Sequence, residues 1–409
     1  MSATRFLTMG VAIALCLLGV MGSSASASPS RILYVSAQAG ARGRGTRTRP
    51  YRSLKRAIAV ARDGATVRVT RGTYEGDLVI KKRTLTVIGG YVGTHFDRRD
   101  IVKARSVIQG TGRDAVVSLI RAGKTRIDGF VIAGGGGSTR DDPKASHGGG
   151  VYVMGGAPTI AHCLIEKNRT TRKGSDIEEA GGGVFAREGD LVLEDSVIRA
   201  NISKRGAGIA LFEMRHAKIR RNVIEDNIAL GDHGGGVYAI CRDLVIAGNL
   251  VRRNEVGRKI GYGWGGGVAT ISKGTRVRFS KNIVTGNFAA SLGSGYFIDD
   301  ESDAVIEQDL IVGNRCAPEG GTAIFVDGLD PTKGSRARII GTSIVNHPCA
   351  GVAKGNAVHA DQHSSVTIVR SVIWNNGDRA LSMGKRAKIT IARSIIQEKR
   401  FSGEGVVHD

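Results

Sequence analysis

Apolar residues after residue 145 lie in short segments where they alternate with polar ones. The stretches 191–193 (Leu-Val-Leu) and 388–391 (Lys-Ile-Thr-Ile) are representative. Alternation that is rich in β-branched residues predicts strands, and strands this short need hydrogen-bonded neighbours on both edges. The apolar positions in this region show no 3.6-residue period, which excludes a helical repeat.

Glycine-rich openings precede these strands at intervals of 25 to 34 residues. The opening at Gly148-Gly149-Gly150 leads into Val151, and the one at Gly234-Gly235-Gly236 leads into Val237. Unequal intervals argue against a propeller, whose blades must close a ring. They suit a coil that adds one parallel strand per turn and tolerates loop insertions.

A second mark follows most openings and consists of two apolar residues, two variable residues and an asparagine. These asparagines are Asn168, Asn201, Asn227, Asn254, Asn287, Asn314 and Asn376, and one coil has Pro348 at this position instead. Their amides are expected to stack and hydrogen-bond from coil to coil at the strand spacing of about 4.8 Å. The sequence therefore predicts an all-β fold, a single-stranded right-handed parallel β-helix or solenoid.

The region before the repeats predicts a cap. A strand at 32–35 is followed by the basic loop 42–49 and a short helix whose apolar residues, Leu54, Ala57, Ile58 and Ala61, share one face. This helix is expected to cover the open end of the solenoid. We expect residues 28–110 to hold the strand, capping helix and first coils, 111–397 the repeats, and 398–409 a tail.

The first 27 residues have the pattern of a signal peptide. Arg5 precedes an apolar run from Met9 to Met21, and the small residues 25–27 predict cleavage after Ala27. The run is shorter than the roughly 20 residues that span a bilayer, and no later segment is apolar enough to cross one. We therefore expect a secreted protein, located outside the cell, in the periplasm or on the surface of a bacterium.

The formal net charge of the chain is +22. Outside the cell such a charge favours an acidic polysaccharide or another anionic cell-surface glycan as partner, and export argues against nucleic acid. A solvated basic surface with no specific partner explains the charge equally well.

The cap and the repeats resemble known proteins. The runs 34–36, 53–58, 67–69 and 72–74 are similar to the opening of pectin-lyase-like secreted β-helix proteins, and the glycine and asparagine repeat resembles chlamydial polymorphic outer-membrane proteins. The resemblance implies the fold and leaves the activity open, because such proteins include lyases, hydrolases, epimerases and adhesins.

Stacked coils predict columns of outward side chains. One column, directly after the inward Val151 and its equivalents, is aromatic: Tyr152, Phe185, Tyr238, Phe297 and Phe325. It is either a platform for stacking sugars or a set of rings that pack together beneath a loop.

A second column holds Asp299, Asp327 and Asp361, with Asp300 beside the first and His359 near the last. Carboxylates at this spacing repel, so a bound cation, a shared proton or nearby basic residues must offset the repulsion. Ca²⁺ held by Asp299, Asp300 and Asp327 would suit uronate β-elimination, and a shared proton would suit glycoside hydrolysis. The alternative is a solvated acidic face.

The loops that enter the glycine openings predict a rim. His147, His233 and Trp264 directly precede their glycines, and Tyr262 lies nearby. Loops on a rigid scaffold commonly carry ligand contacts.

The cysteines predict one disulfide. Cys316 and Cys349 fall at nearby positions on successive coils and are expected to bond, whereas Cys163 and Cys241 do not align and are expected to be small buried residues.

Three functions remain open from the sequence. The first is a protein that binds acidic glycans without cleaving them. The second is a polysaccharide lyase or glycoside hydrolase that uses Asp299, Asp327, Asp361 and His359, and the third is a structural or adhesive surface protein.

Overall fold

The structure is a computed structural model that describes residues 32–93, 95–140, 144–170, 178–317, 321–328, 332–347, 357–377, 379–397 and 406–408. These residues belong to one compact unit, Arg31–Asp409. The predicted signal peptide, residues 1–27, and most of the predicted tail lie outside the described residues.

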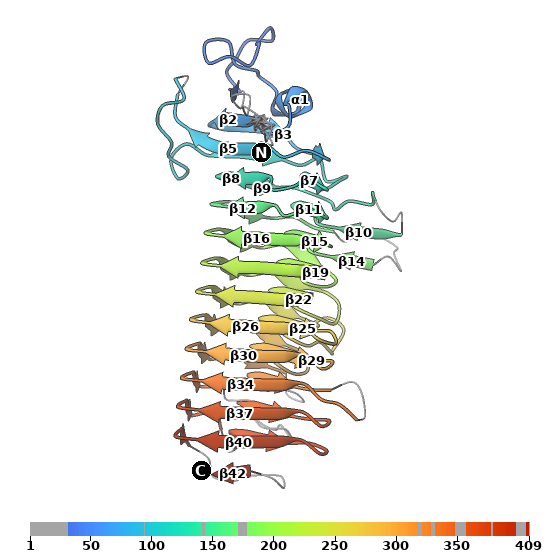
Figure 1. Cartoon of the computed structure of the whole chain (residues 1–409), viewed down its shortest axis with the longest axis vertical. Helices are drawn as coiled ribbons and strands as arrows, with labels where there is room; N and C mark the ends of the chain where they lie inside the picture. The colour runs from blue at the N-terminus through green and yellow to red at the C-terminus, as the bar shows by residue number, and fades with distance from the viewer. Residues whose placement is uncertain are drawn as a thin grey trace, which may run out of the picture. The chain divides into compact units, whose positions relative to one another are not determined.

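Each coil contributes strands to several parallel sheets. In one coil, β15 (Val184–Arg187), β16 (Asp190–Glu194), β17 (Val197–Arg199) and β18 (Ile202–Ser203) follow one another around the solenoid. The next coil repeats the path directly beside it, so that Val184 pairs with Ile209, and Val197 with Val223. Figure 1 shows these coils stacked from β8 to β40. The predicted right-handed parallel β-helix is confirmed.

Every pairing between named strands in the described part of the chain is parallel. The largest sheet holds β1 (Ile32–Val35), β2 (Thr66–Thr70), β4 (Leu78–Lys81), β5 (Thr86–Tyr91), β7 (Val117–Ile120), β8 (Arg126–Asp128), β11 (Val151–Met154), β12 (Thr159–Ala161), β15, β16, β19 (Ile209–Arg220), β22 (Val237–Ala247), β25 (Val268–Ile271), β26 (Arg276–Ser280), β29 (Tyr296–Asp299), β30 (Asp303–Glu307), β33 (Ile324–Val326), β34 (Arg336–Ile340), β36 (Val358–Ala360), β37 (Ser365–Val369), β39 (Leu381–Met383), β40 (Lys388–Ala392) and β42 (Val406–His408).

The second sheet holds β3 (Gly72–Glu75), β6 (Ser106–Gln109), β9 (Phe130–Ala133), β13 (Leu164–Glu166), β17, β20 (Val223–Glu225), β23 (Leu250–Arg252), β27 (Ile283–Thr285), β31 (Leu310–Val312), β35 (Ser343–Val345), β38 (Val372–Trp374) and β41 (Ile395–Ile396). A third is formed by β18, β21 (Ile228–Ala229), β24 (Glu255–Val256), β28 (Phe288–Ala289) and β32 (Arg315–Cys316). The short pair β10 (Ala145–His147) and β14 (Glu178–Ala180) lies to one side of the coils (Figure 1).

One continuous hydrophobic core fills the solenoid. The residues that follow the glycine openings point into it, and Val151, Val184, Ile209 and Val237 are fully buried. Glycine is required in these openings for steric reasons. A Cβ on Gly183 would lie 2.5 Å from the carbonyl oxygen of Gly208 in the next coil, and Gly181 has a φ of +67°, which disfavours other residues.

The predicted asparagine ladder is confirmed from Asn168 to Asn314. From Asn168 to Asn287, each Asn Nδ2 donates to the Asn Oδ1 of the next coil, at 3.0 Å from Asn201 to Asn227 and at 2.9 Å from Asn227 to Asn254. Each amide also donates to a strand carbonyl, as Asn254 does to Ile224 at 2.9 Å. Because the amides are almost fully buried, the ladder satisfies backbone groups at a turn that water does not reach.

The ladder residue of the next coil is His347, and the assignment of that position to Pro348 was wrong by one residue. His347 Nδ1 accepts from the backbone N–H of Asn314 at 3.1 Å, and the His347 N–H donates to Asn376 Oδ1 at 3.1 Å. Burial lowers the pKa of His347 to about 4. The ring is therefore neutral at pH 7 and takes the place of an amide. Pro348 lies outside the described residues.

A second ladder runs through Asn222, Asn249, Asn282 and Asp309, and the sequence analysis missed it. Asn249 Nδ2 donates to Asn282 Oδ1 at 3.1 Å, and the Asn282 N–H donates to Asp309 Oδ1 at 2.7 Å. The Tyr296 hydroxyl donates to Asp309 Oδ2 at 2.7 Å. Burial outweighs these hydrogen bonds and raises the pKa of Asp309 to about 6.

The capping helix is confirmed as α1 (Leu54–Val60). Ser53 caps its N-terminus by accepting from the Arg56 N–H at 3.2 Å. Leu54, Ala57 and Ile58 are buried and belong to the solenoid core. The helix therefore closes the N-terminal end of the core, as its apolar face predicts.

We expect Asn254→Ala to lower the free energy of unfolding by about 2–4 kcal/mol, because it leaves buried partners on two coils without their hydrogen bonds. Denaturant titration followed by circular dichroism measures this change. Asn375→Ala is the control, since the Asn375 side chain is exposed and directly precedes the ladder residue Asn376 on a later coil. Equal losses in the two variants would contradict a structural role for the ladder.

We expect Asp309→Asn to stabilise the protein at neutral pH. A carboxyl whose pKa is raised from 3.8 to about 6 on folding destabilises the fold increasingly as pH rises through that window. The amide does not titrate, so its advantage should grow from pH 4 to pH 7 and reach about 2–3 kcal/mol. Thermal unfolding of both proteins across this range measures the difference, and parallel curves would contradict the expectation.

Candidate functional site

The aromatic column is buried, so it offers no sugar-stacking platform in this structure. Tyr152, Phe185 and Phe325 are at most 1% exposed, and Tyr238 and Phe297 are 6% and 4% exposed. Neighbouring rings stack on one another, with centroids 5.6 Å apart for Tyr152 and Phe185. The alternative in which these rings pack beneath a loop therefore describes the structure.

The predicted rim residues form the layer that covers this column. The His147 ring stacks on Phe185 at 4.3 Å with an interplanar angle of 5°, and His233 stacks on Trp264 at 5.0 Å. His233 and Trp264 form a parallel β-bridge. The strands β10 and β14, which contain His147 and Ala180, also pair in parallel. The loops before the glycines therefore continue the coil-to-coil stacking outside the solenoid.

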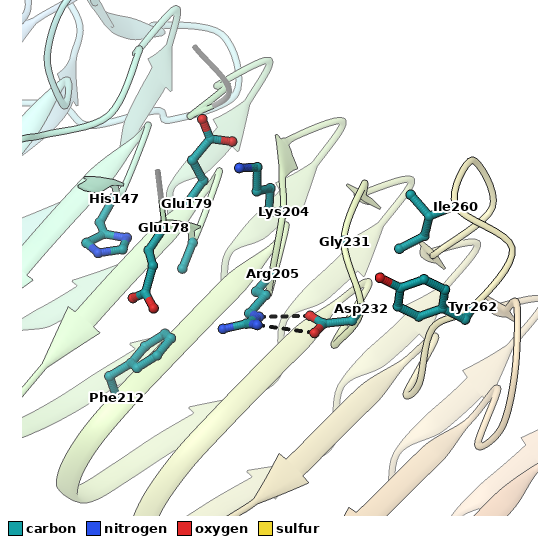
Figure 2. Close-up of a pocket in the computed structure, with 11 residues that line it drawn as sticks. His147, Glu178, Glu179, Lys204, Arg205, Phe212, Gly231, Asp232, Ile260 and Tyr262 are labelled. Carbon is teal, nitrogen blue, oxygen red and sulfur yellow. Dashed lines mark hydrogen bonds and ion pairs between the residues drawn. The ribbon is translucent and has the colours of Figure 1, made fainter. Parts of the chain in front are cut away.

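A pocket of about 260 Å³ opens on the outside of this layer. Its lining comes from successive coils and consists of His147, Glu178, Glu179, Ala180, Lys204, Arg205, Phe212, Gly231, Asp232, Ile260 and Tyr262. Figure 2 shows the Arg205–Asp232 pair between His147 and Phe212 on one side and Ile260 and Tyr262 on the other.

A bidentate ion pair lies at the centre of the pocket. Arg205 Nε and Nη2 donate to the two Asp232 oxygens at 2.8 and 3.1 Å, and His233 Nδ1 lies 3.1 Å from Asp232 Oδ1. Burial alone would raise the pKa of Asp232, but the hydrogen bonds from His233 and Arg205 hold it well below its usual range. The pocket thus presents a fixed carboxylate and a fixed guanidinium at neutral pH.

The walls add an aromatic face and further charges. Tyr262 is 51% exposed and its ring lies 5.8 Å from that of Trp264, which supports it from behind. Glu178 and Lys204 add one charge of each sign. This arrangement can bind a ligand that has both an apolar face and several hydroxyl groups.

The sequence analysis identified part of this pocket. His147 and Tyr262 were predicted as rim residues, whereas Arg205, Asp232 and Phe212 were missed. Arg205 directly precedes Gly206, as His233 directly precedes Gly234. Alignment of the glycine openings therefore predicts that Arg205 also lies in the rim.

The three aspartates do lie on consecutive coils. The Asp327 N–H donates to the Ile298 carbonyl at 2.8 Å, and the Asp361 N–H to the Val326 carbonyl at 2.9 Å. Each carboxylate accepts from the backbone N–H of the following residue, at 2.6 Å for Asp299, 2.9 Å for Asp327 and 2.9 Å for Asp361. Such contacts stabilise the turn at the end of a strand.

The proposed calcium ligands do not assemble into a site. Within the described ranges, no group of three or more His, Cys, Asp or Glu side chains is arranged to hold a metal ion. Burial raises the pKa of Asp299. Asp299, Asp300 and Asp327 thus form no such group in this structure, and Ca²⁺ binding by them stays a prediction.

His359 lies between a serine and an aspartate. Its Nδ1 is 2.6 Å from Ser382 Oγ and its Nε2 is 3.5 Å from Asp361 Oδ2. His359 and Ser382 are only 2% and 3% exposed, and the imidazole stacks on Phe325 at 4.8 Å. This trio is part of the buried layer and does not line the Arg205 pocket.

The cysteine predictions are tested in part. Cys163 and Cys241 are free and buried, as expected. Burial raises the pKa of each thiol to about 12, so both are unreactive at neutral pH. Cys349 lies outside the described residues, so the Cys316–Cys349 bond stays a prediction.

One comparison with known protein families agrees with the fold. Residues 105–292 match the family model described as a right-handed beta helix region. A structural search matches the crystal structure of pectate lyase Pel9A at 12% identity, covering 93% of this chain and 79% of that chain, with a TM-score of 0.34. A search of curated proteins found no significant match.

The family-model match supports the right-handed β-helix fold, and the resemblance to chlamydial proteins stays a prediction. Among the described residues, no helix has the length and apolar character needed to cross a bilayer.

We expect Asp232→Asn to destabilise the protein by about 1 kcal/mol, because it removes a charge that two partly exposed hydrogen-bonding partners, Arg205 and His233, hold in place. Thermal unfolding measures the loss. Asp303→Asn is the control, since Asp303 is an exposed carboxylate at the start of β30. An unchanged melting temperature for Asp232→Asn would mean that the ion pair does not organise the pocket.

Proposed function

We propose that this right-handed β-helix protein is a secreted, non-catalytic glycan-binding protein that holds a polysaccharide in the pocket around Arg205 and Asp232. The observation that carries the proposal is the lining of that pocket, which combines a half-exposed aromatic ring with a fixed ion pair. The extracellular location rests on the predicted signal peptide.

A sugar suits this lining for two reasons. One face of a pyranose is a patch of C–H groups that packs on an aromatic ring, and Tyr262 offers such a ring. The ring hydroxyls both donate and accept hydrogen bonds, and the Arg205–Asp232 pair supplies donors and acceptors in a fixed arrangement. Because the pair is already ordered, binding costs little side-chain entropy.

An acidic glycan suits the chain as a whole. The net charge of +22 attracts a polyanion over long distance. The pocket itself has three carboxylates against Lys204 and Arg205, so the sugar in the pocket is expected to be neutral or to point its acidic group outward. Exposed Arg258 and Lys259 lie in the loop beside Tyr262 and could contact such a group.

The hydrogen bonds and the burial of the predicted catalytic residues favour binding without cleavage over catalysis. The three aspartates accept from the backbone of their own turns. His359 is buried against Phe325 and lies outside the pocket. A polysaccharide lyase or glycoside hydrolase is the alternative function, and a structural or adhesive surface protein is the third.

The test is titration calorimetry with oligogalacturonate and with a neutral oligosaccharide, on the wild type and on Tyr262→Ala. We expect Tyr262→Ala to weaken binding about 5- to 30-fold, the equivalent of one lost aromatic contact. Trp374→Ala is the matched control, because Trp374 is 48% exposed on β38, far along the chain from the pocket.

Incubation of the same glycans with the protein should yield neither unsaturated nor reducing-end products. The appearance of either product would favour the enzyme. Absence of binding to every glycan would overturn the proposal in favour of the structural role, and equal weakening in both variants would place the binding site elsewhere.

A further inference from the structure

The N-terminal cap concentrates positive charge. Residues 31–62 contain nine Lys and Arg residues and no Asp or Glu. The loop between β1 and α1 carries Arg42, Arg44, Arg47 and Arg49, and it lies at the N-terminal end of the coils (Figure 1). This region is separate in sequence and in lining residues from the Arg205 pocket.

The loop encloses a cavity of about 570 Å³. Its lining consists of Ser36, Gln38, Ala39, Gly40, Arg42, Gly43, Arg47, Thr48, Arg49, Pro50 and His95. Backbone hydrogen bonds hold the loop in shape, including Arg44 N–H to the Arg49 carbonyl at 2.8 Å and Tyr34 N–H to the Gly45 carbonyl at 3.0 Å. A Cβ on Gly43 would lie 1.9 Å from the Pro50 carbonyl oxygen, so the two sides of the loop touch.

Two arginines of this cavity have no acidic partner among the described residues. Arg47 contacts Asp97, but neither Arg42 nor Arg49 has a carboxylate within 4.0 Å in the described part of the chain. Some arginines on the coils are paired, as Arg221 is with Asp195 at 2.6 Å and Arg276 with Asp243 at 2.6 Å, and others, such as Arg336 and Arg338, are not paired within the described ranges. What distinguishes Arg42 and Arg49 is that both line one preformed hollow.

We propose that this cavity is an anion-binding site that takes a carboxylate or sulfate group of an acidic polysaccharide. Guanidinium groups bind such oxyanions through paired hydrogen bonds, and a bound anion would give Arg42 and Arg49 an acidic partner. His95 and the Ser36 and Thr48 hydroxyls add hydrogen-bonding groups to the lining. The site does not depend on the Arg205 pocket, and it would give the protein a second point of contact on an acidic chain.

The test uses calorimetry at about 0.15 M salt, where attraction by net charge is screened beyond roughly 8 Å. The probes are a trigalacturonate and a sulfated trisaccharide, which separate the carboxylate from the sulfate. The site variant is Arg42→Gln with Arg49→Gln, which leaves the Arg47–Asp97 contact in place. The matched control is Arg336→Gln with Arg338→Gln, two exposed arginines on β34. Both double variants change the net charge by the same amount.

We expect the site variant to bind at least one of the two probes about tenfold or more weakly than the wild type, and the control to bind within about twofold of it. Equal weakening in the two variants would mean that net charge alone attracts the anion, which would overturn the site. No binding of either probe to the wild type would also overturn it. Thermal unfolding of each variant checks that the fold is retained.

Tyr262→Ala distinguishes this site from the Arg205 pocket. If the cavity binds an anion independently of the pocket, calorimetry of Tyr262→Ala still shows a binding step. That step is absent from the Arg42→Gln, Arg49→Gln variant. If Tyr262→Ala abolishes all binding of both probes, the cavity is not a site. If Tyr262→Ala binds both probes as the wild type does and the Arg42→Gln, Arg49→Gln variant binds neither, the proposed function is refuted and the anion site stands.

Discussion

The register between successive coils is the constraint on which the rest of this structure depends. Side chains alternate along each strand, so a slip of one residue would place Val237 outside the solenoid and move Tyr238 into its core. The glycine openings allow the coils to approach closely, and the buried amides of the asparagine ladder fix which turn lies on which. The same register carries on into the loops, where it places Arg205 beside the His233 turn and so brings Asp232 within hydrogen-bonding distance.

How far the sequence predicts this molecule depends on whether a feature repeats. The solenoid, the helix α1 and the ladder from Asn168 to Asn314 recur or follow a local pattern, and all three were predicted. The second ladder was missed because its column changes residue type, with Ser196 before Asn222 and Thr342 after Asp309. The sequence predicted which residues form the aromatic column but not whether they are buried, because the loops that cover the column differ in length from coil to coil. The pocket was only partly predicted for the same reason.

Charge is distributed differently over the coils and over the cap. Along the coils, acidic and basic residues alternate between neighbouring turns, as His216 does between Asp190 at 3.0 Å and Asp243 at 3.6 Å. Stacked strands would otherwise bring like charges within about 5 Å, where they destabilise a sheet. The cap has no stacked partner coil beyond it, so nothing in its position requires such alternation. An excess of positive charge is therefore tolerated there, and it gathers around a hollow that Arg42, Arg47 and Arg49 line.

Each ladder contains a residue other than asparagine whose side chain accepts from the preceding coil. In both, the amide donors point toward the C-terminal end of the solenoid, so each amide receives a hydrogen bond from the coil before and donates to the coil after. Aligned hydrogen bonds of this kind polarise one another. Asp309 receives the donors of Asn282, and the neutral ring of His347 receives the N–H of Asn314 through Nδ1. At both positions the backbone N–H still donates to the following coil, from Asp309 to Thr342 Oγ1 at 3.3 Å and from His347 to Asn376 Oδ1 at 3.1 Å. An acceptor side chain can therefore replace asparagine there without interrupting the ladder.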